Sequence, residues 1–178
     1  MELFEALARK RACRTFSKEP VPADLVRQLI YAFTRAPTAS NRPYRHCIVI
    51  DDANVIRAVR RVSPSLLADP PLLFIVFTDL QVALHRTGKV AEFSSLVDSG
   101  AAGENVLLAA TALGLGSQFT MISTQAAIQV ILGLPSHCRV DLIIPIGTPS
   151  APVKSVKAPA SANIAYHNQY GVRHELGQ

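Results

Sequence analysis

The longest apolar stretch of the chain lies between residues 98 and 121. From residue 101 to 115 it consists mostly of Ala, Leu and Val, contains no proline, and is apolar in most directions around a helix axis. This pattern predicts one long central helix. Asp98 is expected at its start, where a carboxylate favours the helix dipole. Gly114 and Gly116 are expected to end the helix and to begin an extended segment.

Shorter apolar patterns predict the remaining elements. Runs at 47–50, 72–77 and 140–146 predict strands, the last two of them buried. Helical patterns predict helices at 2–8, between Pro22 and Pro37, and at 53–62 and 124–132. Residues 81–89 give no clear pattern, and Gly88 favours a mobile loop there. Because the strands and helices lack a regular βαβ spacing, the fold class is predicted to be α+β.

Length and composition predict one domain over residues 1–178, without a repeat or an internal linker. Residues 148–178 are rich in proline and glycine and poor in core residues, which predicts an extended C-terminal arm wrapping a partner subunit. Hydrophobic residues make up 49% of the chain and charged residues only 17%. This excess of apolar surface also favours an obligate oligomer.

The net charge of +5, with basic residues clustered early, fits an anionic cofactor, nucleic acid or a solvated surface. No nucleic acid is expected, because interleaved aromatic residues and nucleic-acid motifs are lacking. Three cysteines without CxxC spacing favour reduced thiols in a cytoplasmic protein, with no zinc or redox-pair signature and hence no metal site. No membrane is expected either, since no apolar run reaches the length of a span and the charged start is unlike a secretory signal.

Common catalytic and nucleotide-binding motifs do not fit the chain. Gly114 and Gly116 are spaced like a dinucleotide fingerprint, but the third glycine position holds Phe119 and these glycines end a helix instead of opening one. P-loop, HExxH and GxSxG motifs do not occur, and the five histidines show no ligand spacing.

Two irregular segments are candidates for binding. Lys10, Arg11 and Arg14 place several cationic donors within one turn, where they could converge on a phosphate; charge alone favours a solvated surface over a site. Residues 37–41 (PTASN) are by themselves a turn.

Taken together and in order, the segments of the chain resemble the FMN-dependent nitroreductase family. The motifs that carry the resemblance are KRACRTF (10–16), APTASNRPY (36–44), DSGAAGENVLLAATALGLGS (98–117), IPIGTP (144–149) and IAYHNQYG (164–171). The resemblance implies a nitroreductase-like three-layer α+β fold, with a mixed β-sheet flanked by helices. It also implies a homodimer that binds FMN in two equivalent pockets at the interface.

The resemblance further implies which residues contact FMN. They are Lys10, Arg11, Ala12, Arg14, Pro37, Thr38, Ala39, Ser40, Asn41, Met121, Ile122, Lys154 and Lys157. The basic positions at 10–14 would hold the phosphate and ribityl chain, and residues 37–41 would pack on the flavin of the other subunit. The backbone at 121–122 would reach the flavin N5 region, and the two lysines would lie near the phosphate. No side chain is expected to act as an obligatory acid or base, because the flavin carries the chemistry.

The chain departs from the family pattern at two of these places. Ala12 replaces a usual serine, which removes one phosphate ligand, and the loop after Asn41 reads Arg42-Pro43-Tyr44, one residue shorter than the usual Gln-Pro-Trp version. The resemblance implies an oxidoreductase that passes electrons from NAD(P)H through FMN to a small-molecule acceptor such as a nitroaromatic or a quinone. The departures support an alternative, a protein that binds or sequesters FMN with little turnover.

Overall fold

The computed structural model describes residues 1–120, 122, 124–152 and 165–172. Its central sheet has the strand order β1-β2-β4-β3. The strands are β1 (Arg45–Ile50), β2 (Leu72–Asp79), β3 (Gly116–Ser117) and β4 (Cys138–Gly147). The three strands predicted from apolar runs are confirmed, and β3 is the extended segment expected after the long helix.

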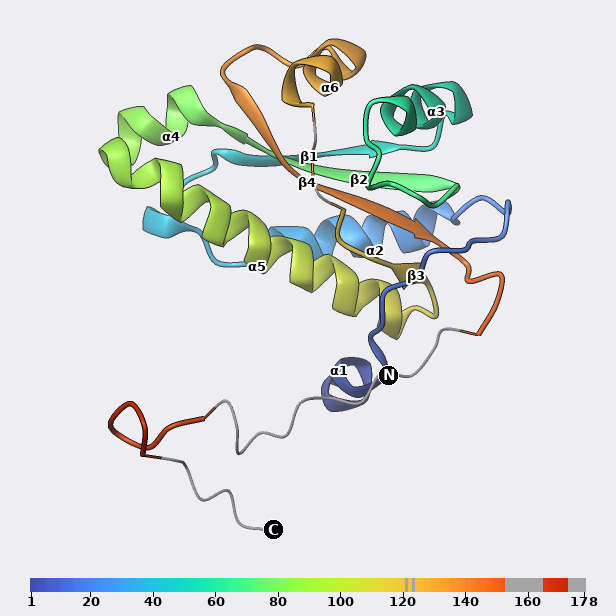
Figure 1. Ribbon diagram of the computed structural model, residues 1–178, viewed down its shortest axis with the longest axis horizontal. Coiled ribbons are helices and arrows are strands. Elements are labelled where there is room, and N and C mark those ends of the chain that lie inside the picture. The colour runs from blue at the N-terminus through green and yellow to red at the C-terminus, as the bar shows by residue number, and fades with distance from the viewer. Residues whose placement is uncertain (121, 123, 153–164, 173–178) are drawn as a thin grey trace.

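Helices cover both faces of this sheet (Figure 1). The helices are α1 (Leu3–Arg9), α2 (Ala23–Thr34), α3 (Ala53–Arg61), α4 (Leu80–Thr87), α5 (Ala91–Ala112) and α6 (Gln125–Leu132), with short 3-10 turns at Ala39–Asn41 and Gly88–Val90. α2 and α5 lie on one face and α3 and α6 on the other, while α1 lies outside α5. The predicted three-layer α+β architecture is therefore confirmed.

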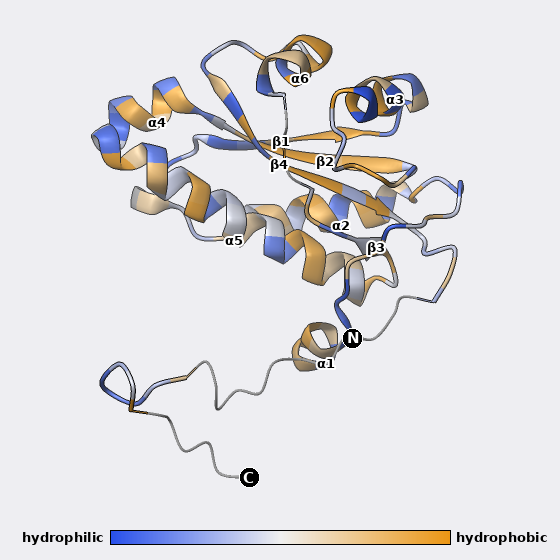
Figure 2. Ribbon diagram, viewed as in Figure 1, coloured by the Kyte–Doolittle hydropathy of each residue, from blue (hydrophilic) through white to orange (hydrophobic). Residues whose placement is uncertain are grey.

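The strand β2 is apolar throughout residues 72–77 because both of its faces are buried. Successive side chains of a strand point to opposite faces. Phe74 and Val76 belong to the core beneath α2 and α5, whereas Leu73 and Ile75 belong to the core beneath α3 and α6. Figure 2 shows the central strands as an apolar layer between the two helix layers.

All pairings between the named strands are antiparallel. A parallel contact, the isolated bridge between Ala12 and Ser117, lies outside the pairings of the named strands. Within the residues that the structure describes, no helix is both long enough and apolar enough to cross a membrane. Most of the expected C-terminal arm, including 153–164, lies outside the described residues.

Two local predictions are wrong. The long helix begins at Ala91, so Asp98 lies well inside it and is buried, with no role at the helix start. The mobile loop expected at 81–89 is largely the helix α4, because Asp79 caps its first turn by accepting a hydrogen bond from the Val82 N–H (2.9 Å). Gly88, with φ of +65°, ends this helix and does not begin a loop.

Candidate functional site

The chain leaves α1 at Lys10 and becomes extended over residues 10–16, which we call the basic segment. The Cys13 N–H donates to the Ser117 carbonyl (3.0 Å) in β3. This close approach requires a glycine in β3, because a Cβ at Gly116 would lie 2.5 Å from the Cys13 sulfur. The basic segment is therefore fixed as an extra strand-like edge beside β3.

Cys13 and its two neighbours in the basic segment face in opposite directions. Cys13 is buried, and its burial raises the pKa of its thiol, which suits a packing residue and not a nucleophile. Ala12 and Arg14 on either side of it are exposed. Because side chains of an extended chain alternate, burial of Cys13 orients both neighbours outward.

The other two cations of the basic segment lie against the protein. The Lys10 ammonium is 3.8 Å from a Glu104 carboxylate oxygen of α5 and 5.8 Å from the centre of the Phe119 ring. The Arg11 guanidinium donates to the Lys10 carbonyl (2.7 Å), and its Nε is buried without a hydrogen-bond partner. An unpaired buried donor among three cations fits an anionic group such as a phosphate.

The second candidate segment, residues 36–45, is here called the anchored loop. Its 3-10 turn places Asn41 at a φ of +50°, a backbone conformation that asparagine tolerates. Asp98 of α5 fixes this loop from below: its Oδ2 accepts hydrogen bonds from the Ala39 N–H (2.8 Å) and from the Tyr44 hydroxyl (2.5 Å). Tyr44 is fully buried, and burial together with the Asp98 carboxylate raises its pKa to about 12.

Arg45 closes the anchored loop from the side of the sheet. Its guanidinium donates to the carbonyls of Pro37 and Asp98 (both 2.9 Å), Ala36 (3.2 Å) and Phe33 (3.3 Å). Burial lowers the pKa of Arg45, whereas the Asp98 carboxylate opposes this shift. A fork with five fixed donors suits this task, because four carbonyls from α2, α5 and the loop converge on one group.

The outer side of the anchored loop borders an open hollow of about 270 Å³. It is lined by the end of α2, the loop itself and the start of β1, with Thr38 and Asn41 among its residues. Pro37 and Asn41 are exposed, while Thr38 and Ala39 are half-buried. The loop is thus rigid at its base and presents backbone and small side chains to the outside.

The basic segment and the anchored loop do not form one pocket within a single chain. The basic segment contacts α5 at Glu104, and the loop contacts it at Asp98. Six positions along an α-helix correspond to a rotation of about 240° and a rise of about 9 Å. The two segments therefore lie on different sides of α5.

The remaining predicted site residues are only partly described. Ile122 is half-buried and packs against the core under α6. Met121, Lys154 and Lys157 lie outside the described residues, as does the side chain of Ser40. The predicted contacts of all these residues with a flavin stay predictions.

The sequence reasoning missed Asp98, Tyr44 and Arg45 as the residues that shape the loop. The available signal was a carboxylate at position 98 beside the mostly apolar run of α5, since such a group is buried only when hydrogen-bonded. A second buried carboxylate, Asp141 in β4, accepts from Ser99 of α5 (2.7 Å) and from Arg139 (2.5 Å). Polar residues of α5 thus form hydrogen bonds with buried groups of the anchored loop and of β4.

The sequence of this chain is similar to those of known proteins. Residues 7–71 and 53–148 match the model of the nitroreductase family. An NADH dehydrogenase of Thermus thermophilus is 27% identical in an alignment 176 residues long, which covers 82% of this chain and 85% of that protein.

Solved structures share the fold. An FMN-dependent nitroreductase of Clostridium difficile superposes with a TM-score of 0.82 at 20% identity, covering 94% of this chain and 99% of that one. An NADPH:FMN oxidoreductase of Vibrio harveyi, complexed with NAD+, superposes with a TM-score of 0.79 at 22% identity, covering 94% of this chain and 77% of that one. At this level of identity the likeness concerns the fold.

Proposed function

Since this chain belongs to the nitroreductase family, we propose that it is an FMN-dependent oxidoreductase. It passes electrons from NAD(P)H through bound FMN to a small acceptor, such as a nitroaromatic or a quinone, in two successive half-reactions. The names of the similar proteins, an NADH dehydrogenase and an NADPH:FMN oxidoreductase among them, support this class of reaction. The observation that carries the proposal is the basic segment, with its outward-facing Arg14 and its unpaired Arg11 Nε.

In this proposal Lys10, Arg11 and Arg14 hold the FMN phosphate and the adjoining ribityl chain. Guanidinium and ammonium donors form strong, charge-assisted hydrogen bonds with phosphate. The Glu104 carboxylate of α5 lies 3.8 Å from the Lys10 ammonium and holds it against that helix. Lys154 and Lys157 are proposed to add positive charge from the tail.

FMN, when bound, supplies the hydride and electron transfer. The chain contributes binding, orientation and positive charge, which favours the more anionic reduced state. The anchored loop contributes a rigid wall, because Asp98 and Arg45 fix its backbone from α5 and β1. The backbone of residues 121–122 is proposed to donate to the ligand.

We also propose that the active form is a homodimer. Apolar side chains of α1 and α5 are exposed: Leu3, Phe4 and Leu7 in α1, and Phe93, Leu96 and Val97 in α5. Phe4 is 82% exposed and Phe93 72% exposed, which is unusual for large apolar residues on neighbouring helices. Within one chain the anchored loop and the basic segment lie on different sides of α5. In a dimer the anchored loop of one subunit can reach the basic segment of the other.

The oligomer proposal has a direct test. Analytical ultracentrifugation of the purified protein should give the mass of a dimer at micromolar concentration. Val97→Glu should shift the protein toward monomer and release flavin, whereas Arg57→Glu, an exposed change in α3 on the other face of the sheet (Figure 1), should do neither. A wild-type monomer that retains FMN would contradict the proposal.

The activity is tested by reducing the purified protein without oxygen. A yellow protein that bleaches with NADH or NADPH and regains colour on adding a quinone or nitroaromatic supports the oxidoreductase. A yellow protein that stays oxidised points to the alternative of FMN sequestration. A colourless protein with salt-dependent affinity for DNA would refute both.

A further inference from the structure

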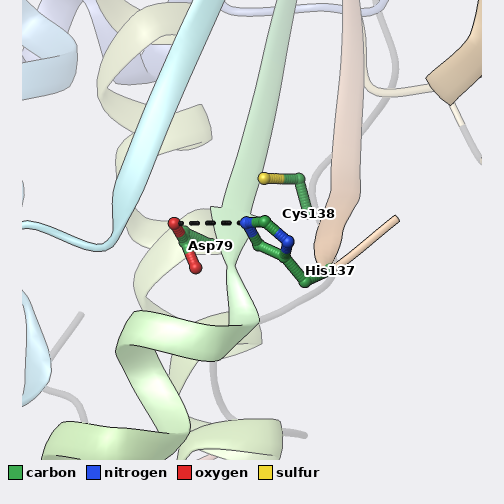
Figure 3. Close-up of side chains that lie close together, drawn as sticks. All are labelled: Asp79, His137 and Cys138. Carbon is green, nitrogen blue, oxygen red and sulfur yellow. Dashed lines mark ion pairs between the residues drawn. The ribbon is translucent and has the colours of Figure 1, made fainter. Parts of the chain in front are cut away.

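A cluster of three different metal-ligating groups lies at the meeting point of β2, α4 and β4. Asp79 is the last residue of β2, and in the strand register it stands opposite Cys138, the first residue of β4. His137 precedes Cys138, and its Nε2 is 3.7 Å from Asp79 Oδ2 (Figure 3). One ligand atom from each of the three residues lies within 4.8 Å of the others.

The backbone around this cluster is held on every side. The Leu80 N–H donates to the His137 carbonyl (3.1 Å), and the Asp79 N–H donates to the Tyr44 carbonyl (2.8 Å). The Cys138 carbonyl accepts from the Gln129 side chain of α6 (2.7 Å). The ligand atoms are therefore presented by a rigid frame and not by a free loop.

We propose that Asp79, His137 and Cys138 bind a divalent transition-metal ion, with Zn²⁺ as the best match. Sulfur, imidazole nitrogen and carboxylate oxygen are the ligand types that zinc takes, and three protein ligands leave a fourth position for water. Tetrahedral zinc with ordinary bond lengths places such atoms about 3.3–3.6 Å apart. The 3.7 Å between His137 and Asp79 is already close to that separation.

Each group has an atom available for the ion. Asp79 uses Oδ1 to cap α4 through the Val82 N–H, which leaves Oδ2 toward the cluster. The His137 side chain is 40% exposed, so an ion can enter from solvent, while Cys138 forms the buried floor of the site. Sequence spacing could not reveal this set, because only the β2–β4 pairing brings Asp79 beside Cys138.

The site is separate from the basic segment of the same chain. The basic segment meets the sheet at β3, which pairs with Gly147 at the far end of β4. β4 has ten residues, and a strand of that length spans about 30 Å. The ion would therefore join the ends of two strands to the start of α4 and stabilise the fold.

The test uses the full-length protein, treated with a chelator and titrated with Zn²⁺ alone by calorimetry. We expect one Zn²⁺ per chain and a higher melting temperature with zinc. His137→Ala and Asp79→Asn should each weaken binding at least tenfold, and Asn at position 79 retains an oxygen to cap α4. The matched controls are His85→Ala on exposed α4 and Cys47→Ser in β1, which should bind as the unaltered chain does.

Co²⁺ provides the second readout, because a bound thiolate gives a charge-transfer absorption. The band should appear when the spectrum of Cys138→Ser with Co²⁺ is subtracted from that of the unaltered protein with Co²⁺. The flavin absorption is the same in both proteins and cancels. Absence of Zn²⁺ binding, or binding that survives His137→Ala undiminished, would overturn the proposal. A cobalt band that persists in Cys138→Ser would also overturn it, since another cysteine would then be the ligand.

Discussion

Arg14 in the basic segment faces outward and Arg45 in the anchored loop faces inward, although both are arginines of irregular segments that border the proposed flavin site. Arg14 is exposed. Arg45 donates to four backbone carbonyls and lies with its guanidinium 5.0 Å from the Phe33 ring. The backbone of the basic segment is fixed by β3, so Arg14 is available for a ligand. The backbone of the anchored loop is instead fixed by its own cation, Arg45.

This difference separates binding from stability. A charge that makes no bond within the protein contributes little to folding, so removing it should affect ligand affinity alone. A buried charge bonded on several sides contributes mainly to folding, because its loss leaves its partners unsatisfied. The two segments therefore predict opposite responses to similar substitutions.

The largest effect is expected for Asp98→Ala in α5. The change leaves the Tyr44 hydroxyl and the Ala39 N–H without their acceptor in a buried position. The free energy of unfolding should fall by about 3 kcal/mol, measured by denaturant titration. Glu92→Ala, an exposed acid of the same helix, is the control and should change stability little. Equal losses in the two variants would mean that the loop is not held by Asp98.

The next effect concerns the basic segment. Arg14→Ala should weaken FMN binding by about 1–3 kcal/mol, the value of a charge-assisted hydrogen bond, without lowering the melting temperature. Fluorescence titration of the flavin-free protein measures the affinity. Lys18→Ala removes an exposed cation four residues away and should leave affinity unchanged. An Arg14→Ala protein that binds FMN normally would remove this residue from the site.

A smaller effect is expected for Tyr44→Phe, with a characteristic pH dependence. Loss of the hydroxyl should lower the free energy of unfolding by about 1–2 kcal/mol. The pKa of Tyr44 is raised to about 12 in the folded protein from its ordinary value of 10. Its stabilisation is therefore complete below pH 10 and is lost as pH rises through 12. Denaturant titrations of both proteins over this pH range should show their difference shrinking; a constant difference would contradict the assigned hydrogen bond.

Most of the fold was predictable because burial on both faces leaves a simple sequence signal. The run 72–77 in β2 is apolar without interruption, the run 142–146 in β4 is apolar after Asp141, and α3 begins where Asp52 caps it. Helix α4 was not predicted because its start depends on Asp79 as the N-cap, and an aspartate after an apolar run equally well indicates the end of a strand. The first two turns of α5 were missed since residues such as Ser95 are polar, and only the folded chain shows that Ser95 accepts a hydrogen bond from Arg139.

The candidate site was predictable only where its chemistry is local. The cations at 10–14 are neighbours in sequence, so their clustering was visible in advance. The base of the anchored loop depends on Asp98, which is 54 positions from Tyr44 and is brought to it by the packing of α5 on the sheet. Pairings of this kind follow from tertiary structure and leave no trace in spacing.

The smallest effect, and the only expected gain, concerns Ala12 in the basic segment. The family pattern implies a serine here, and the structure shows that Ala12 is exposed beside the buried Cys13. In Ala12→Ser the added hydroxyl stays in contact with water until a phosphate arrives, so it carries no burial cost and the melting temperature should not change. A hydrogen bond from this hydroxyl to a charged phosphate is worth about 1.4 kcal/mol, which corresponds to roughly tenfold tighter FMN binding. Ala8→Ser adds the same group to an exposed position of α1 and should leave affinity unaltered. Weaker or unchanged FMN affinity in Ala12→Ser would show that this side of the basic segment does not face the phosphate.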